Sequence, residues 1–197
     1  MDMPPLGLSQ SRRHLLGAGI RHVLLAEAPA GVLPIRPAPA VEARPEPREL
    51  CEPWTGYLKR VPPSPKLVWT YWELGQDLAG EGDQNRSECW RRLIQNLGWP
   101  RGTVGFWPFA IFSGGNLVPG IEDFLCGLRR IEPRGLVVFG VEPLLACLEA
   151  ELAGGDLGTW LHRPVHLAPS PSQLVAGPQD EQERITEELR RFYASLS

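Results

Sequence analysis

The chain has 197 residues, of which 43% are hydrophobic and 22% charged, and its formal net charge is −3. Its length suits one core of roughly 130 to 150 residues with an appendage. Residues 66–197 carry twelve Lys and Arg against seventeen Asp and Glu, a balance of −5. This balance excludes a generally basic surface for nucleic acid, because phosphate binding depends on clustered Lys and Arg.

Neither a membrane span nor a metal site is expected. No segment reaches the roughly 20 apolar residues that a span needs. No two cysteines lie in a CxxC or Cys/His ligand spacing, so we expect no metal and no cofactor. Cysteines in apolar helical patterns are typical of reduced core thiols, which predicts a cytoplasmic protein. The cysteines are Cys51, Cys89, Cys126 and Cys147.

Residues 1–65 form a predicted N-terminal tail and lead-in. Eight prolines lie before residue 48, and the segment "PIRPAPAVEARPEPRE" (34–49) cannot sustain a helix or a central strand. Within the tail, residues 12–29 form a short apolar segment that is typical of a docking site for a protein partner. A twin-arginine export signal is the alternative, but Arg21, His22 and Glu27 interrupt its apolar stretch. The predicted partner-binding residues are Arg12, Arg13, Leu15, Leu16 and Ile20.

From residue 66 onward, apolar strand patterns alternate with helical ones. The order predicts an α/β domain over 66–197, a three-layer αβα sandwich around a four-stranded parallel sheet. Functional groups are then expected in the loops that follow the strands, at the carboxyl edge of the sheet. We expect strands at 66–72, 102–109, 135–140 and 163–168, and helices at 86–98, 119–133, 143–155 and 180–196.

Two of these loops together resemble motifs of the uracil-DNA glycosylases. Gly75-Gln76-Asp77 follows the first strand, as their Gly-Gln-Asp-Pro-Tyr-His motif does. "LAPSPSQL" (167–174) is similar to their His-Pro-Ser-Pro-Leu-Ser motif after the fourth strand. The resemblance implies the glycosylase-like fold, with Asp77 positioning the water that attacks the glycosidic bond of a flipped base. It also implies a ligand loop that contains Pro169, Ser170, Pro171 and Ser172.

Several positions depart from that pattern. Ala168 occupies the place of the histidine that donates to the uracil oxygen, and a methyl group cannot donate. The second strand offers no base-reading asparagine, and Asn116 is expected to serve a turn. Glu142 replaces a phosphate-holding Gly-Ser. Asp77 therefore has an alternative role as the cap of a turn.

The layout is also similar to that of the psi subunit of bacterial DNA polymerase III, which has the glycosylase fold without an active site. In that family an N-terminal tail engages the clamp-loader complex. "RRHLLGAGIRHVLL" (12–25) lies where that tail has an arginine pair and a Leu-Gly-Ile-like segment. This resemblance implies a protein that acts through protein contacts.

Two tryptophans near strand ends, Trp72 and Trp107, are candidates for a base-stacking platform, although aromatic residues on buried strands are usually core. Three functions remain open. The first is a non-catalytic protein of a replication or repair assembly, with only weak DNA contacts. The second is an active glycosylase that relies on Asp77. The third is an unrelated α/β binding protein.

Overall fold

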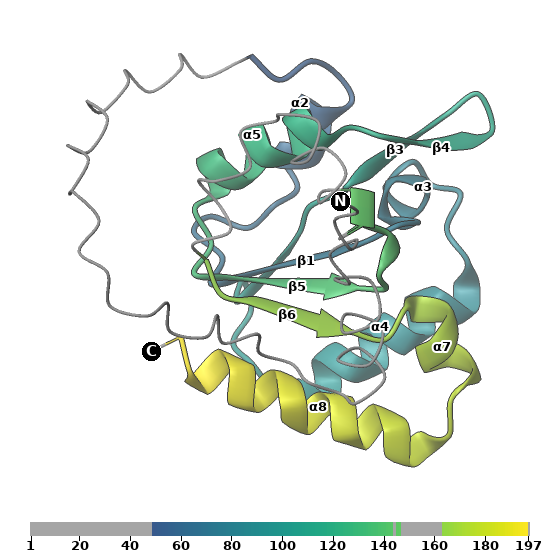
Figure 1. The fold of residues 1–197 in the computed structure, drawn as a ribbon, viewed down its shortest axis with the longest axis vertical. Coiled ribbons are helices and arrows are strands. Elements are labelled where there is room, and N and C mark those ends of the chain that lie inside the picture. The colour runs from purple at the N-terminus through teal and green to yellow at the C-terminus, as the bar shows by residue number, and fades with distance from the viewer. Residues whose placement is uncertain (1–48, 144, 147–162, 197) are drawn as a thin grey trace, which may run out of the picture. The chain divides into compact units, whose positions relative to one another are not determined.

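The computed structural model describes residues 49–143, 145, 146 and 163–196 (Figure 1). It contains a four-stranded parallel sheet in the order β2-β1-β5-β6. The strands are β1 (Leu67–Tyr71), β2 (Val104–Phe106), β5 (Gly135–Phe139) and β6 (Val165–Ala168). The predicted α/β class and parallel sheet are confirmed.

Helices cover both faces of the sheet because β1 and β5 are apolar on both sides. Val68, Leu136 and Val138 face the helices α2 (Trp54–Leu58) and α5 (Ile121–Ile131). Trp69, Val137 and Phe139 face α4 (Gln84–Leu97), α7 (Pro171–Ala176) and α8 (Gln179–Ala194). Figure 1 shows α2 and α5 on one side of the sheet and α4 and α8 on the other.

The expected strand at 102–109 is shorter and is followed by a hairpin. β2 ends at Phe106, and Ala110–Ser113 (β3) pairs with Asn116–Pro119 (β4) in an antiparallel ladder. Gly114 and Gly115 have φ values of 58° and 83°, the left-handed conformation that a two-residue hairpin turn requires. Asn116 donates from Nδ2 to the Gly114 carbonyl at 3.3 Å, so it does serve a turn.

Two other predicted loops contain short helices. Leu74–Leu78 forms α3, so Asp77 lies in a helix rather than a loop. The last predicted loop forms α7. Both helices are too short to show a helical period of apolar residues in the sequence. The helix expected at 143–155 falls largely outside the described residues, as do the apolar tail segment 12–29 and most of the Pro-rich tail.

The domain includes part of the predicted lead-in. Leu50, Trp54 and Tyr57 are buried in the core on the α5 side of the sheet. The Trp54 ring lies 5.4 Å from that of Trp107. The domain therefore begins before residue 66, the position at which the sequence pattern places its start.

Candidate functional site

The side chain of Asp77 lies in a cluster with Tyr71 and Arg86 at the carboxyl edge of β1. Arg86 donates from Nε to both carboxylate oxygens, at 2.8 Å to Oδ2 and 3.1 Å to Oδ1, and from Nη2 to Oδ1. Tyr71 donates from its hydroxyl to Oδ2 at 2.5 Å. The side chains of Arg86 and Asp77 are 12% and 14% exposed. Both carboxylate oxygens are thus held by donors of the protein itself.

The local elements explain this geometry. Tyr71 ends β1, Asp77 lies in α3 and Arg86 lies in the first turn of α4. A cation in the first turn of a helix opposes the helix dipole. That unfavourable placement is the sequence signal that could have indicated a carboxylate partner for Arg86. The bidentate pair ties α3 to α4.

Burial and charge in the cluster shift two pKa values. Desolvation raises the pKa of Tyr71, and its hydrogen bond to Asp77 raises it further. The hydrogen bonds to Asp77 raise the pKa of Arg86, against a smaller opposing effect of burial. Tyr71 is therefore a neutral donor and Arg86 a permanent cation at any physiological pH. Chemically the cluster is an ion pair between Asp77 and Arg86 in which the Tyr71 hydroxyl is an additional donor to the carboxylate. We call it closed because donors of the protein itself hold both carboxylate oxygens.

Gly75 and Gln76, the other residues of the first motif, differ in their packing. An ideal Cβ on Gly75 would lie 2.0 Å from the carbonyl oxygen of Ala110, so only glycine lets α3 approach β3 this closely. Gln76 is half-buried, and its carbonyl accepts from the Glu81 N–H at 3.1 Å. Close packing thus accounts for the glycine of the motif.

The second motif forms a helix start. Ser170 is the N-cap of α7 and its Oγ accepts from the Gln173 N–H at 3.3 Å. The Gln173 side chain accepts from the Ser170 N–H at 2.8 Å, which completes a capping box. Pro171 occupies the first turn and is buried, Pro169 is half-buried, and Ser172 is exposed.

The strand register brings the two motif regions to the same edge. Tyr71 pairs with Phe139, and Phe139 pairs with Ala168. Ala168 is 4% exposed, and its carbonyl accepts from the Gly140 N–H at 3.0 Å. An ideal Cβ on Gly140 would lie 3.3 Å from Cβ of Ser170, so the ends of β5 and β6 are in close contact.

The aromatic candidates differ in exposure. Trp107 is fully buried, and its indole N–H donates to the Phe124 carbonyl at 2.9 Å. Trp72 is half-buried, and its ring centroid lies 6.0 Å from that of Phe109. Trp107 therefore packs in the core, directly after the end of β2.

His166, on β6, faces α8 rather than the carboxyl edge. Its ring stacks on Phe192 with centroids 5.3 Å apart, and its Nε2 lies 3.9 Å from a Glu188 oxygen. It is half-buried in the sheet–helix interface. His166 therefore does not take the place of the motif histidine, whose position at the strand end is occupied by Ala168.

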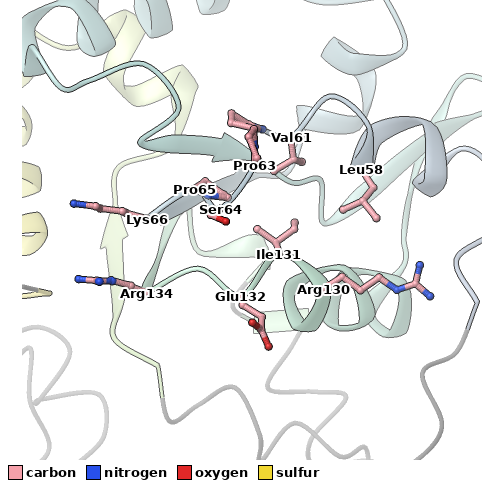
Figure 2. A pocket seen from close by; sticks show the side chains of 11 residues that line it. Leu58, Val61, Pro63, Ser64, Pro65, Lys66, Arg130, Ile131, Glu132 and Arg134 are labelled. Carbon is pink, nitrogen blue, oxygen red and sulfur yellow. The ribbon is translucent and has the colours of Figure 1, made fainter.

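The opposite, amino edge of the sheet contains a pocket of about 460 Å³, which we call the amino-edge pocket. Figure 2 shows that the pocket lies between the proline-rich segment and the end of α5, both of which contribute lining residues. The prolines that precede β1 in the sequence, Pro62, Pro63 and Pro65, form part of its lining. The pocket is lined by Leu58, Val61, Ile131, the segment 62–66, Arg130, Glu132 and Arg134.

Three further observations concern the predicted docking segment, metal binding and membrane spans. The predicted tail residues Arg12, Arg13, Leu15, Leu16 and Ile20 lie outside the described residues. Within the described ranges, no group of three or more His, Cys, Asp or Glu side chains is arranged to hold a metal ion. No helix in that same part of the chain is long and apolar enough to cross a membrane.

The chain matches no model of a known protein family and no curated protein.

Proposed function

We propose that the chain is a non-catalytic protein of glycosylase-like architecture that acts through protein contacts in a DNA replication or repair assembly. The observation that carries the proposal is the closed Asp77–Arg86 pair, in which Arg86 and Tyr71 hold both carboxylate oxygens. A water-positioning carboxylate needs a lone pair that faces an open site.

The energy of the pair argues against a simple rearrangement to a catalytic form. Freeing Asp77 would leave Arg86, only 12% exposed, without its partner. Breaking a buried pair in this way typically costs about 3 to 5 kcal/mol. Ala168 adds to the argument, because its buried methyl group stands where the resemblance requires a donor to the developing negative charge.

The tail supports the second half of the proposal. Its apolar segment at 12–29 sits in a proline-rich context that is typical of a docking peptide, as the similarity to the psi subunit implies. A cytoplasmic location belongs to the same proposal, and the free thiols of Cys51 and Cys89 are consistent with a reducing compartment.

A uracil-excision assay tests the non-catalytic half. Protein in excess is incubated with uracil-containing single- and double-stranded oligonucleotides, and abasic sites are cleaved with alkali. We expect no excision by the natural chain. Excision that Asp77→Asn abolishes, and that the exposed-site control Glu81→Gln leaves intact, would contradict the proposal and establish the glycosylase alternative.

A partner-capture experiment tests the other half. One variant replaces Arg12, Arg13, Leu15, Leu16 and Ile20 with alanine, and the control replaces Arg36 and Arg44. We expect the first variant alone to lose replication or repair proteins from the captured set. Identical sets for all three proteins would exclude the tail as the docking segment and leave the unrelated-binding alternative.

A further inference from the structure

We propose that four aromatic side chains on the α4 side of the sheet carry an electron from buried Tyr71 to a one-electron oxidant of the radical class that reaches the protein surface. The four are Trp99, Trp69, Trp90 and Tyr71, in that order from the surface inward, and we call them the aromatic path. Tyr71 is the final electron donor, and Asp77 takes its phenolic proton. This activity goes beyond the proposed function and requires neither a partner protein nor nucleic acid.

The rings of the aromatic path are in contact from one end to the other. The ring centroid of Trp99 lies 6.4 Å from that of Trp69, which lies 5.9 Å from that of Trp90. The Trp90 and Tyr71 centroids are 4.9 Å apart. Separations of about 4.5 to 7 Å are those of packed aromatic pairs. Because electron transfer slows steeply with distance, short steps between touching rings are faster than one long step.

The two ends of the aromatic path differ in exposure. Trp99 is half-buried and directly follows Gly98, the C-cap of α4. The rings further inward are buried: Trp69 is 0%, Trp90 6% and Tyr71 2% exposed. A small oxidant in the solvent therefore meets the path at Trp99 and not at Tyr71.

The middle of the aromatic path lacks proton acceptors. An indole that loses an electron becomes far more acidic at its N–H, and a neighbouring base that takes the proton traps the radical there. The N–H groups of Trp69 and Trp90 are buried and have no acceptor in hydrogen-bond geometry among the described residues. An electron vacancy on either ring is therefore not trapped and passes on.

The inner end has the acceptor that the middle lacks. Tyr71 donates from its hydroxyl to Oδ2 of Asp77 at 2.5 Å. An oxidised phenol is a strong acid, and a carboxylate in hydrogen-bond contact with it is placed to take its proton. Arg86 donates to both oxygens of Asp77 and holds the carboxylate in position. A vacancy that reaches Tyr71 is therefore trapped there as a neutral phenoxyl radical.

Electrons and protons balance over the whole path. The oxidant is reduced when it takes one electron from Trp99, which is refilled from Trp69, and Trp69 from Trp90. Tyr71 then gives one electron to the Trp90 radical cation, while its O–H bond breaks and a new O–H bond forms on Asp77. The products are the reduced oxidant, a neutral Tyr71 radical and a protonated Asp77, and the three indoles return to their starting state.

The charge near the outer end favours transfer inward. Tyr193, on α8, packs on Trp99 with ring centroids 4.8 Å apart, so it competes with Trp69 for the vacancy. The Lys66 ammonium lies 5.4 Å from the centroid of the Tyr193 ring. A cation at this distance disfavours a second positive charge on the same ring. The vacancy on Trp99 is therefore directed toward Trp69.

Core packing alone does not account for these residue types. Phe106 and Phe139 lie in the same cluster, with ring centroids 5.7 and 5.1 Å from that of Trp69, so phenylalanine suits this part of the core. A buried N–H without an acceptor lowers stability, and phenylalanine in place of Trp69 or Trp90 would avoid that loss. The path consists instead of tryptophan and tyrosine, the aromatic side chains that one-electron oxidants attack.

Pulse radiolysis of the full chain tests the proposal. Azide radicals, which take one electron from tryptophan, are generated in the protein solution, and transient absorption follows the tryptophan and tyrosyl radicals. We expect the tyrosyl signal to grow as the tryptophan signal decays, at a rate that is independent of protein concentration and slower in D₂O. No tyrosyl growth, growth proportional to protein concentration, or equal rates in D₂O and water would overturn the proposal.

Phenylalanine variants of the three tyrosines identify the final donor. Tyr71→Phe should remove most of the tyrosyl signal and prolong the tryptophan signal. Tyr57→Phe is the matched control, since Tyr57 is buried on the opposite side of the sheet, and it should leave the yield unchanged. Tyr193→Phe should also keep the signal. A signal that Tyr193→Phe removes and Tyr71→Phe leaves intact would show that the vacancy stays at the surface, and would refute the path.

Trp90→Phe tests the middle of the path, because it keeps a ring at that position but removes an oxidisable one. Tyrosyl growth should slow by about tenfold or more, whereas Trp107→Phe, in the core across the sheet, should stay within about twofold. Near-ultraviolet circular dichroism checks that each variant is folded, and Trp69→Phe makes the same test if Trp90→Phe is not. An unchanged rate in the folded variant would contradict the path. The excision and partner-capture assays detect neither radical, so failure here is distinct from failure of the proposed function.

Discussion

At the scale of single residues, the side chains with the clearest roles are Asp77 and Arg86. Because each neutralises the other in a mostly buried position, removal of one should cost more than removal of both. We expect Asp77→Asn and Arg86→Gln each to lower the free energy of unfolding by about 3 to 5 kcal/mol. The double variant should lose clearly less than the sum of the two.

Urea unfolding of the four proteins measures this coupling. Tyr71→Phe is the graded control, since it removes one donor to Oδ2 and leaves the ion pair in place. Strictly additive losses would show that Asp77 and Arg86 are not energetically paired. The position of Arg86 in the first turn of α4 could indicate from the sequence that it needs a carboxylate partner, but the nine-residue separation follows no helical period that would identify Asp77 as that partner.

Gly75 makes a second residue-scale prediction. Its ideal Cβ would overlap the Ala110 carbonyl, so Gly75→Ala must push α3 away from β3. We expect a loss of about 1 to 3 kcal/mol, as for other overpacked sites. Gln76→Ala, on the same helix and half-buried, should change stability by less than about 1 kcal/mol. Thermal unfolding of both variants is the measurement, and similar melting temperatures would contradict the packing argument.

At the scale of elements, the two serines of "PSPS" offer a matched test. Ser170 caps α7 through its Oγ, whereas Ser172 is exposed in the first turn. Ser170→Ala should cost about 1 kcal/mol and Ser172→Ala close to nothing. Equilibrium unfolding in urea separates them. A larger loss at Ser172 would mean that the motif is held together by something other than the capping box.

The accuracy of sequence prediction also depends on the element. β1, β5, α4, α5 and α8 could be predicted to within about two residues, because apolar spacing over a long stretch is a strong signal. The sequence pattern predicts loops where α3 and α7 form, because one or two turns contain too few residues to show a helical period. The β3–β4 hairpin was missed although Gly114-Gly115 between apolar runs is a hairpin signal.

At the scale of the whole molecule, the two edges of the sheet have different characters. The carboxyl edge, where α/β folds usually bind ligands, is occupied by a closed ion pair, a capping box and close backbone contacts. The amino edge has the pocket, which is lined by apolar side chains, prolines and charged residues. Motif reasoning could find only the first edge, since the pocket residues come from two separate segments, 58–66 and 130–134, that no motif connects.

The extent of the domain is the last prediction. Trp54 is 3% exposed, packs on Trp107, and its ring fills the space above Gly120, where a Cβ would lie 2.5 Å from it. Loss of a buried tryptophan costs about 3 to 5 kcal/mol, which is a large share of the stability of a domain this size. A chain of residues 49–197 should therefore unfold cooperatively, whereas one of residues 66–197, the predicted domain, should not. Near-ultraviolet circular dichroism and urea unfolding compare the two chains. Trp54→Phe in the longer chain is the conservative control, and it should lose only part of the stability because an aromatic ring still fills most of the site. A cooperative transition of equal midpoint in the shorter chain would show that the lead-in is an appendage after all.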